Sequence, residues 1–291
     1  MKFILNISIC ALAVLAFAQA AQADDEGMVY YVNLFAGDNP GEDRCGDAST
    51  DDLSWGDDNA GYLLAYMNIW SFDRVEYHYN TGADWRYFAD EDEDADGEDD
   101  VLDRGVDTGD VAFIYSHGGA VCDGDYFSAI LMGDSSGTNE CFLDFGDYAG
   151  NDVEWGDTDL NMIILNACQS LQLCVFEGAN GIQYDTGSLV IINGFHGYSW
   201  DGSTHYGNFQ DYVENSRTAN VGDNWVDFMS EEDISGSDDE CGVCVIFKDT
   251  ETAADDVYNN GGIQDWKTPG SHNQTYYYYQ DGCNPAGGPE L

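Results

Sequence analysis

The sequence predicts an α/β fold with a mostly parallel central sheet and helices on both of its faces. Three short apolar runs, at residues 111–115, 162–165 and 189–192, have the continuous hydrophobicity of strands that are buried on both sides. A stretch with helical periodicity at residues 59–70 places Tyr62, Leu63, Tyr66, Met67 and Trp70 on one face. Alternation of strand-like and helix-like segments is typical of parallel sheets.

Other segments extend this pattern along the chain. Further strands are predicted at residues 29–35, 74–79, 243–247 and 275–279, and further helices at 208–214 and 224–229. No composition shift marks a linker. We therefore expect one main α/β domain at residues 24–230, with a β-rich C-terminal extension at 231–291 that packs on the same domain.

The first 23 residues have the pattern of a secretory signal peptide. Lys2 precedes an apolar run from Phe3 to Phe17, and small-residue cleavage signals follow at residues 18–23. The apolar run is shorter than the roughly 20 residues that a membrane-spanning helix needs. We expect a protein that is secreted or periplasmic after removal of this segment, with no membrane partner.

The charge of the chain is strongly negative. It carries 56 acidic and 8 basic residues, a formal net charge of −48, which excludes nucleic acid as a partner. Its 43% hydrophobic content, with 19 Tyr, 14 Phe and 7 Trp, supports a folded core rather than disorder. Salt adaptation, binding of many calcium ions and a cationic partner are three explanations for the charge. The spread of acids over the whole chain favours salt adaptation.

Eight cysteines lie outside the signal segment: Cys45, Cys122, Cys141, Cys168, Cys174, Cys241, Cys244 and Cys283. Export permits disulfides. Because the count is even, one free nucleophilic cysteine requires a second unpaired one. The Cys241 and Cys244 pair, with His272 and Cys283, could hold zinc in a cytosolic protein. In an exported protein we expect a bridge to Cys283 instead.

Two predicted strands run directly into reactive residues. The first ends at His117-Gly118-Gly119 and the second at Cys168-Gln169-Ser170. In open α/β sheets ligands bind beyond the carboxyl ends of the strands, so His117 and Cys168 face each other if the strands are neighbours. An imidazole can take the proton of a thiol, and the N–H groups of Gly118 and Gly119 could bind an oxyanion. The alternative is a disulfide between Cys168 and Cys174, with His-Gly-Gly as a turn.

This arrangement resembles the caspase-like, or clan CD, cysteine peptidases, in which a His-Gly closes one strand and an Ala-Cys closes the next. The separation of 51 residues (168 − 117) is near the roughly 50 expected for caspases. Asn-Ala-Cys-Gln-Ser departs from the caspase pentapeptide at its first and last positions. Over about residues 55–230 the chain is similar to an uncharacterised bacterial family of exported caspase-like proteins, through the segments Gly105 to Phe113, Ser116 to Gly118, Trp155 to Leu160, Ala167 to Leu171 and Gly194 to His196.

The resemblance implies a caspase-like three-layer sandwich and a His117–Cys168 dyad for acyl transfer, without a cofactor and without a named substrate. We expect Gly119, Gln169 and His196 to line the same cleft, and Trp200, Asp201 and His205 follow His196 closely.

The resemblance leaves open which substrate residue such a site prefers at P1, the position before the cleaved bond. Caspases hold an aspartate with arginines, but the five arginines outside the signal segment all lie far in sequence from His117 and Cys168. Asp123 and Asp125, soon after the histidine, could instead favour peptide substrates with Lys or Arg at P1, as in the gingipain-like branch. The alternative is that both aspartates are ordinary loop residues.

Residues 92–103 match a calcium-binding loop. Asp92, Asp94, Asp96, Gly97 and Asp103 fall at positions 1, 3, 5, 6 and 12 of the EF-hand pattern. The last ligand is Asp rather than Glu, and the flanks lack clear helices. The sequence therefore predicts a structural calcium ion, with a solvated charge run as the alternative.

Two functions follow from these observations. The first is an exported, salt-adapted caspase-like cysteine peptidase. The second is a non-catalytic extracellular binding or structural protein that keeps the fold and is stabilised by calcium.

Overall fold

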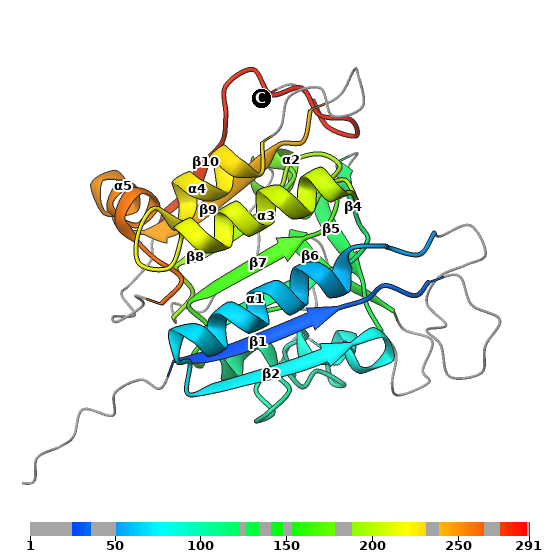
Figure 1. Ribbon diagram of the computed structural model, residues 1–291. Helices are drawn as coiled ribbons and strands as arrows, with labels where there is room; N and C mark the ends of the chain where they lie inside the picture. The colour runs from blue at the N-terminus through cyan, green and yellow to red at the C-terminus, as the bar shows by residue number, and fades with distance from the viewer. Residues whose placement is uncertain are drawn as a thin grey trace, which may run out of the picture.

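The computed structural model describes residues 25–35, 51–92, 94–122, 126–133, 141–147, 153–177, 188–230, 239–264, 274–289 and 291. A seven-stranded sheet runs through the molecule in the order β10-β9-β8-β7-β3-β1-β2 (Figure 1). Its strands are β1 (Glu26–Tyr31), β2 (Arg74–Tyr79), β3 (Val111–Tyr115), β7 (Met162–Asn166), β8 (Ile191–Phe195), β9 (Gly242–Lys248) and β10 (Gln274–Tyr278).

The sheet is mostly parallel, as the sequence predicts. The pairs β2–β1, β1–β3, β3–β7 and β7–β8 are parallel, whereas β8–β9 and β9–β10 are antiparallel. Every residue of the central strands β3, β7 and β8 is buried. Continuous apolar runs form these strands because both faces of a central parallel strand are covered.

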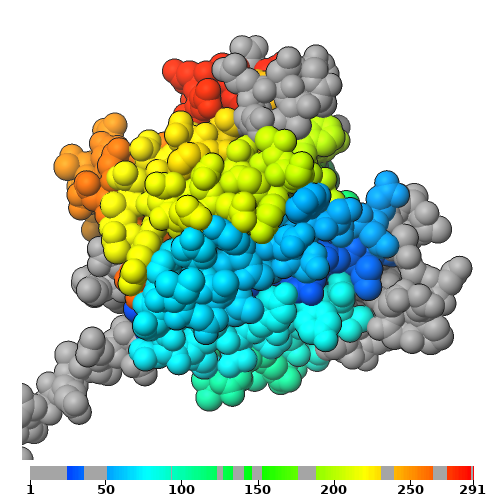
Figure 2. All heavy atoms as spheres, in the orientation of Figure 1, coloured from blue at the N-terminus to red at the C-terminus, as the bar shows by residue number. Residues whose placement is uncertain are grey.

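Four helices cover one face of this sheet: α1 (Gly56–Trp70), α3 (Ser203–Asn215), α4 (Val221–Phe228) and α5 (Glu251–Asn260). Their apolar side chains, such as Leu63, Phe209 and Trp225, pack with Phe113 and Ile164 of the sheet in one core. Figure 2 shows the side chains of α1 in blue and of α3 and α4 in yellow closely packed over this face. Burial of this apolar surface is the main force that holds the helices in place.

The other face differs from the prediction of helices on both faces. In the described residues it is covered by the segment around Trp85 and Phe88, by Trp155, and by a small antiparallel sheet. The small sheet has the order β4-β5-β6, formed by β4 (Gly118–Cys122), β5 (Tyr126–Leu131) and β6 (Phe142–Asp147). Short 3₁₀ turns at Asn80–Gly82, Trp85–Tyr87 and Val106–Thr108, and the five-residue helix α2 (Leu173–Glu177), complete the elements.

The later part of the chain joins the main sheet. β9 pairs with β8, with Phe195 opposite Gly242, and β10 pairs with β9 at the edge. β9 and β10 therefore extend the main sheet instead of forming a sheet of their own.

Two disulfides link described residues: Cys122–Cys174 and Cys241–Cys283. The second confirms the expected bridge to Cys283. Disulfides persist in oxidising compartments, so they indicate an extracellular-like environment. In the described part of the chain, no helix has the length and apolar character needed to cross a membrane.

The charge predicts a strong response to salt. Arg74, Arg86 and Arg104 each pair with carboxylates, but a formal charge of −48 leaves a large excess of acidic over basic side chains. We expect the melting temperature to rise steeply between low and molar sodium chloride, because salt screens this repulsion. Thermal unfolding at several salt concentrations tests it, and a flat melting temperature would remove the salt-adaptation hypothesis.

Candidate functional site

The predicted dyad residues lie at the same level at the carboxyl edge of the sheet. β3 and β7 are adjacent and parallel, with Tyr115 opposite Asn166 in the register. The Ser116 N–H still donates to the Asn166 carbonyl at 3.2 Å. His117 and Cys168 each follow two residues after the Tyr115–Asn166 pair. The expectation that the two strands are neighbours is therefore confirmed.

Cys168 has a free thiol, and its side chain is partly exposed. Cys174 is bonded to Cys122, so the alternative disulfide between Cys168 and Cys174 does not occur. Cys244 is also free and buried, and it is thus a second unpaired cysteine, which the even number of cysteines requires when Cys168 is free. The Cys168 Sγ lies 3.4 Å from the Ser199 carbonyl oxygen. Burial raises the pKa of the Cys168 thiol, so the thiol is protonated at neutral pH and needs a base to react.

His117 is positioned by a backbone carbonyl and an aromatic ring. Its Nε2 lies 2.8 Å from the Asp51 carbonyl oxygen, and its ring meets Phe35 edge-on at 4.6 Å between centroids. A carbonyl only accepts, so this contact requires the proton on Nε2. The Nδ1 of the neutral ring then keeps a lone pair with which it can take a proton.

Gly118 lies against the backbone of Cys168. A Cβ at this position would collide with the Cys168 carbonyl oxygen and come within 3.1 Å of the Ala167 Cβ. A Cβ at Gly119 would meet only the Gln169 Oε1, at 3.8 Å. This close approach explains why glycine follows His117, because only a residue without a side chain lets the backbone at 118 come so near the backbone at Cys168.

Gln169 follows the thiol and links two segments. Its φ is +53°, and its Oε1 accepts from the Ala120 N–H at 3.2 Å while its Nε2 donates to the Gly287 carbonyl. The Ser128 hydroxyl donates to the Gln169 carbonyl at 2.9 Å. The amide of Gln169 thus holds β4 and residue 287 beside the thiol.

His196 is fully buried, and both of its ring nitrogens are occupied. Nδ1 accepts from the Leu173 N–H at 3.0 Å, and Nε2 lies 3.1 Å from the Pro289 carbonyl oxygen. In this conformation the main chain at Pro289 covers His196 Nε2, so a substrate reaches this side chain only when that segment moves away. The substrate role of His196 stays a prediction.

A group of buried polar side chains lies next to the thiol. Glu240 Oε1 accepts from His205 Nδ1 at 2.7 Å and from the Trp200 N–H at 2.8 Å. Asp201 accepts from the Tyr115 hydroxyl at 2.8 Å. Trp200 follows Ser199, whose carbonyl oxygen is 3.4 Å from the Cys168 Sγ, so Glu240 lies close to the thiol. Its negative charge adds to the raised pKa of Cys168 and of Tyr115.

Several polar atoms of this neighbourhood have no hydrogen-bond partner. They are Glu240 Oε2, His205 Nε2, Trp200 Nε1 and both amide atoms of Asn166. Asn166 on β7 pairs with Tyr115 on the neighbouring strand β3. The centroid of the His205 ring lies 6.2 Å from that of Tyr115 and 5.7 Å from that of Phe195. Buried polar groups are nearly always paired, so this concentration of polar atoms marks a place that suits a polar ligand group.

Sequence reasoning singled out Trp200, Asp201 and His205 but missed Asn166 and Glu240. Asn166 ends an otherwise apolar strand two residues before the cysteine, which is a usable signal. Glu240 has no comparable signal, because its place depends on the pairing of β8 with β9. Asp123 and Asp125 lie outside the described residues.

The acidic segment 90–103 is ordered partly by its own backbone. Asp94 Oδ1 accepts from the Asp96 N–H at 2.8 Å, and a Cβ on Gly97 would come within 2.5 Å of the Ala89 carbonyl. The Asp103 carboxylate pairs with Arg74 at 2.6 Å. Within the described residues, which omit residue 93 of this segment, no three His, Cys, Asp or Glu side chains are placed to share a metal ion.

Calcium binding by this segment stays a prediction with a direct test. We expect calcium to raise the melting temperature and the double variant Asp92→Asn, Asp96→Asn to lose that rise. A ligand that binds only the folded state stabilises it by about 2.7 kcal/mol at a hundredfold excess over Kd. Equal stabilisation by magnesium, or by sodium at matched ionic strength, would point to screening alone.

Asp99 predicts an unusual pH dependence of stability. Burial raises its pKa to about 8, and the nearby carboxylates of Asp90 and Asp157 add to the shift. An unfolded Asp titrates near 4, so between about pH 4 and pH 8 the folded state holds the extra proton. Stability contributed by Asp99 is therefore present at low pH and lost as pH rises towards 8.

We expect the melting temperature to fall between pH 5 and pH 8, and Asp99→Asn to flatten that fall. The change in unfolding free energy is on the order of a few kcal/mol. Thermal melts at matched salt measure it. The exposed neighbour gives the control: Asp100→Asn should keep most of the slope, and an equal effect of both variants contradicts the assignment.

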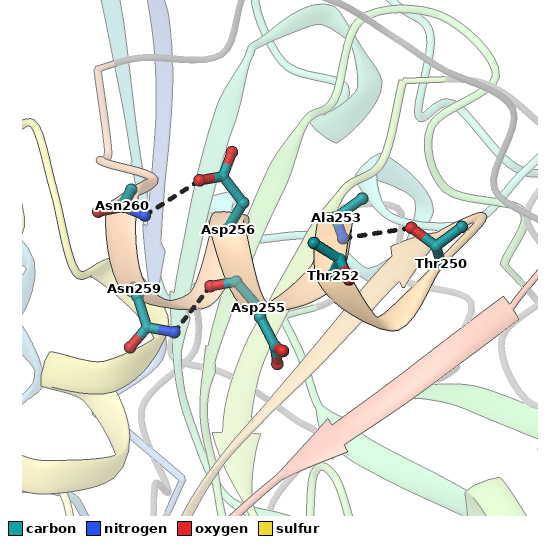
Figure 3. A pocket seen from close by; sticks show the side chains of 7 residues that line it. All are labelled: Thr250, Thr252, Ala253, Asp255, Asp256, Asn259 and Asn260. Atoms are coloured by element: carbon teal, nitrogen blue, oxygen red, sulfur yellow. Dashed lines mark hydrogen bonds between the residues drawn. The ribbon is translucent and has the colours of Figure 1, made fainter.

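A surface recess lies along α5, lined by residues that include Thr250, Asp255 and Asn259 (Figure 3). Asn260 Nδ2 donates to Asp256 Oδ1 at 3.0 Å, and Asn259 Nδ2 donates to the Asp255 carbonyl at 2.7 Å. α5 follows β9, which runs antiparallel to β8, so this helix begins at the sheet edge opposite Cys168. The recess is thus separate from the candidate site.

Comparison with known proteins gives one match. No curated protein and no solved structure matches the chain. A family model covers residues 41–281, which is most of the chain. The chain therefore belongs to the family described as a domain of unknown function, DUF6345.

Proposed function

We propose that this protein is an exported cysteine peptidase with a caspase-like fold, in which His117 is the general base and Cys168 the nucleophile. One observation carries the proposal: a free thiol and a histidine stand at the same level beyond two adjacent parallel strands. The carboxyl edge of a parallel sheet is where such folds bind their ligands.

The chemistry follows from the positions of the donors and acceptors. His117 Nδ1 takes the Cys168 proton, and the thiolate sulfur attacks the peptide carbonyl carbon, which places negative charge on its oxygen. The Gly118 N–H donates to this oxyanion. Collapse of the intermediate breaks the C–N bond, and the His117 proton leaves with the amine. Water then hydrolyses the thioester by the same route in reverse.

The substrate class follows from the polar group beside the thiol. Glu240 places negative charge near the thiol, and its Oε2 and the Asn166 Oδ1 are acceptors without a hydrogen-bond partner. A Lys or Arg side chain at P1 would donate to these acceptors, whereas an aspartate at P1 would meet the like charge of Glu240. The neighbourhood therefore supports the preference for basic residues first argued from Asp123.

A fluorogenic peptide panel in molar salt tests the function and the preference together. We expect cleavage after Arg or Lys to exceed cleavage after Asp. High salt suppresses long-range attraction, so a remaining preference must come from direct contact. A clear preference for Asp would overturn the assigned substrate class.

A second candidate is a non-catalytic extracellular binding or structural protein of the same fold, stabilised by calcium. The observation that favours it is the raised pKa of the Cys168 thiol, with its sulfur directed at the Ser199 carbonyl. It predicts no hydrolysis of any panel peptide, while stability and calcium response persist.

A further inference from the structure

Residues 283–291 close a loop at the carboxyl edge of the sheet. Cys283 is bonded to Cys241, the Asp239 N–H donates to the Asn284 carbonyl at 3.1 Å, and the Leu291 N–H donates to the Cys283 carbonyl at 2.9 Å. In Figure 1 this red segment lies above the β8–β9 side of the molecule. The loop is thus anchored at both of its ends.

The middle of this loop, residues 285–289, is here called the strap. The main-chain carbonyls of the strap accept hydrogen bonds from a row of donors. The Tyr198 N–H donates to the Ala286 carbonyl at 2.9 Å, and His196 Nε2 donates to the Pro289 carbonyl at 3.1 Å. The Gly287 carbonyl accepts from Gln172 Nε2 at 3.1 Å and also from Gln169 Nε2. Because His196 Nδ1 accepts from the Leu173 N–H, its Nε2 carries the proton and donates. These bonds to the strap therefore use carbonyls of its main chain, not its side chains.

Close backbone packing accompanies these bonds. A Cβ on Gly197 would collide with Pro285 and come within 2.7 Å of the Ala286 carbonyl oxygen. Gly287 has a φ of +77°, and a Cβ there would collide with the Tyr198 ring. The glycines allow the strap to lie directly against residues 196–198.

The strap holds both segments that flank the thiol. Gln169 is bonded to Gly287 and follows Cys168 directly. Tyr198 is bonded to Ala286 and precedes Ser199, whose carbonyl is 3.4 Å from the Cys168 Sγ. Opening of the strap would remove one hydrogen bond from each of the two segments beside the sulfur.

We infer that the donor row of Gln169, Gln172, His196 and Tyr198 is a binding surface for the main chain of a turned peptide segment, and that the strap, which forms a turn at residues 286–288, is its tethered occupant and restrains access to Cys168. A segment that is recognised through its main-chain carbonyls binds largely independently of its sequence. The inference rests on the proposed peptidase function, since a peptide bound there would lie against the residues next to the thiol.

Two glycines with the same backbone conformation provide a matched test. Gly287→Ala collides with Tyr198, whereas Gly282→Ala, at a φ of +83°, has open space around its Cβ. The full-length variants are labelled with iodoacetamide in the folded state, and labelling of Cys168 and of buried Cys244 is followed by mass spectrometry. We expect Gly287→Ala to speed Cys168 labelling about tenfold by favouring local opening, and Gly282→Ala to leave it within about twofold.

The occupant is tested with a capped synthetic peptide of residues 284–289, Asn-Pro-Ala-Gly-Gly-Pro. It should slow Cys168 labelling in Gly287→Ala and not in the parent protein. Equal labelling of the two glycine variants, or no effect of the peptide, overturns the inference. If Gly287→Ala does not fold, Gly288→Ala, whose Cβ would approach the His196 ring to 3.1 Å, applies the same test with a smaller displacement.

The labelling readout does not need hydrolysis. Faster labelling of Gly287→Ala, in a protein that cleaves no peptide, would contradict the peptidase proposal and support the role of the strap. Peptide cleavage by the protein, with labelling of Gly287→Ala unchanged, would support the peptidase proposal and contradict the role of the strap.

Discussion

Replacing Cys168 with alanine is expected to abolish peptide cleavage and leave the fold intact. Loss of a nucleophile costs at least about 10³-fold in turnover, because no other group can form the acyl intermediate. The melting temperature should change little, since the side chain is partly exposed and bonded only to one backbone carbonyl. Cleavage of the best panel peptide and thermal unfolding of the same preparation give the two numbers.

Cys244→Ala is the matched control for this variant. Its thiol is also free, but it is fully buried in the core under α4 and α5. It should keep full activity and lose stability, in the order of 1 kcal/mol for the cavity. Activity that survives Cys168→Ala would place the nucleophile elsewhere.

Gly118→Ala is the second variant with a large expected effect. The added Cβ must displace the Cys168 backbone or β4, because it collides with the Cys168 carbonyl and lies 3.3 Å from the Cys168 nitrogen. A displacement near 1 Å between reacting groups lowers turnover by about 10²-fold. Overpacking of this kind also costs about 1–3 kcal/mol of stability.

Gly119→Ala separates the contact at Gly118 from a general effect of glycine replacement. Its Cβ would meet Gln169 Oε1 only at ordinary contact distance, 3.8 Å. We expect its cleavage rate and melting temperature to stay close to those of the parent. Equal damage by both variants would show that the close approach at Gly118 is not what the site depends on.

The central strands and the first helices could be predicted because their sequence patterns have direct physical causes. β3 and β7 are apolar throughout since both faces are covered, and α1 shows its buried stripe through Leu63 and Met67. The dyad residues followed from the same runs, because parallel strands bring their carboxyl ends to one edge.

The parts that could not be predicted depend on contacts between distant segments or lack a periodic signal. β4 begins at Gly118 and is glycine-rich, so it has the composition of a turn. α5 buries one residue, Ala254, and thus shows no apolar stripe, although Thr250 caps its start. In the described residues the second face is covered by the small sheet and by the segment around Trp85 and Phe88, and the pairing of Cys122 with Cys174 cannot be derived from cysteine spacing.

The strap and the polar group around Glu240 share this origin. Each brings a late segment of the chain to the strand ends through the β8–β9 pairing. The sequence around Gln169 and around Glu240 does not indicate which distant residues these side chains contact.

The most direct test of the dyad is the rate of Cys168 alkylation by iodoacetamide in the folded protein as a function of pH, compared with His117→Ala. The thiol has a raised pKa, so at neutral pH its reaction depends on a base. We expect His117→Ala to lower the alkylation rate near pH 7 by about tenfold or more, and the rates of the two proteins to converge at high pH, where hydroxide ionises the thiol. Identical pH profiles in the two proteins would contradict the assignment of His117 as the base for Cys168.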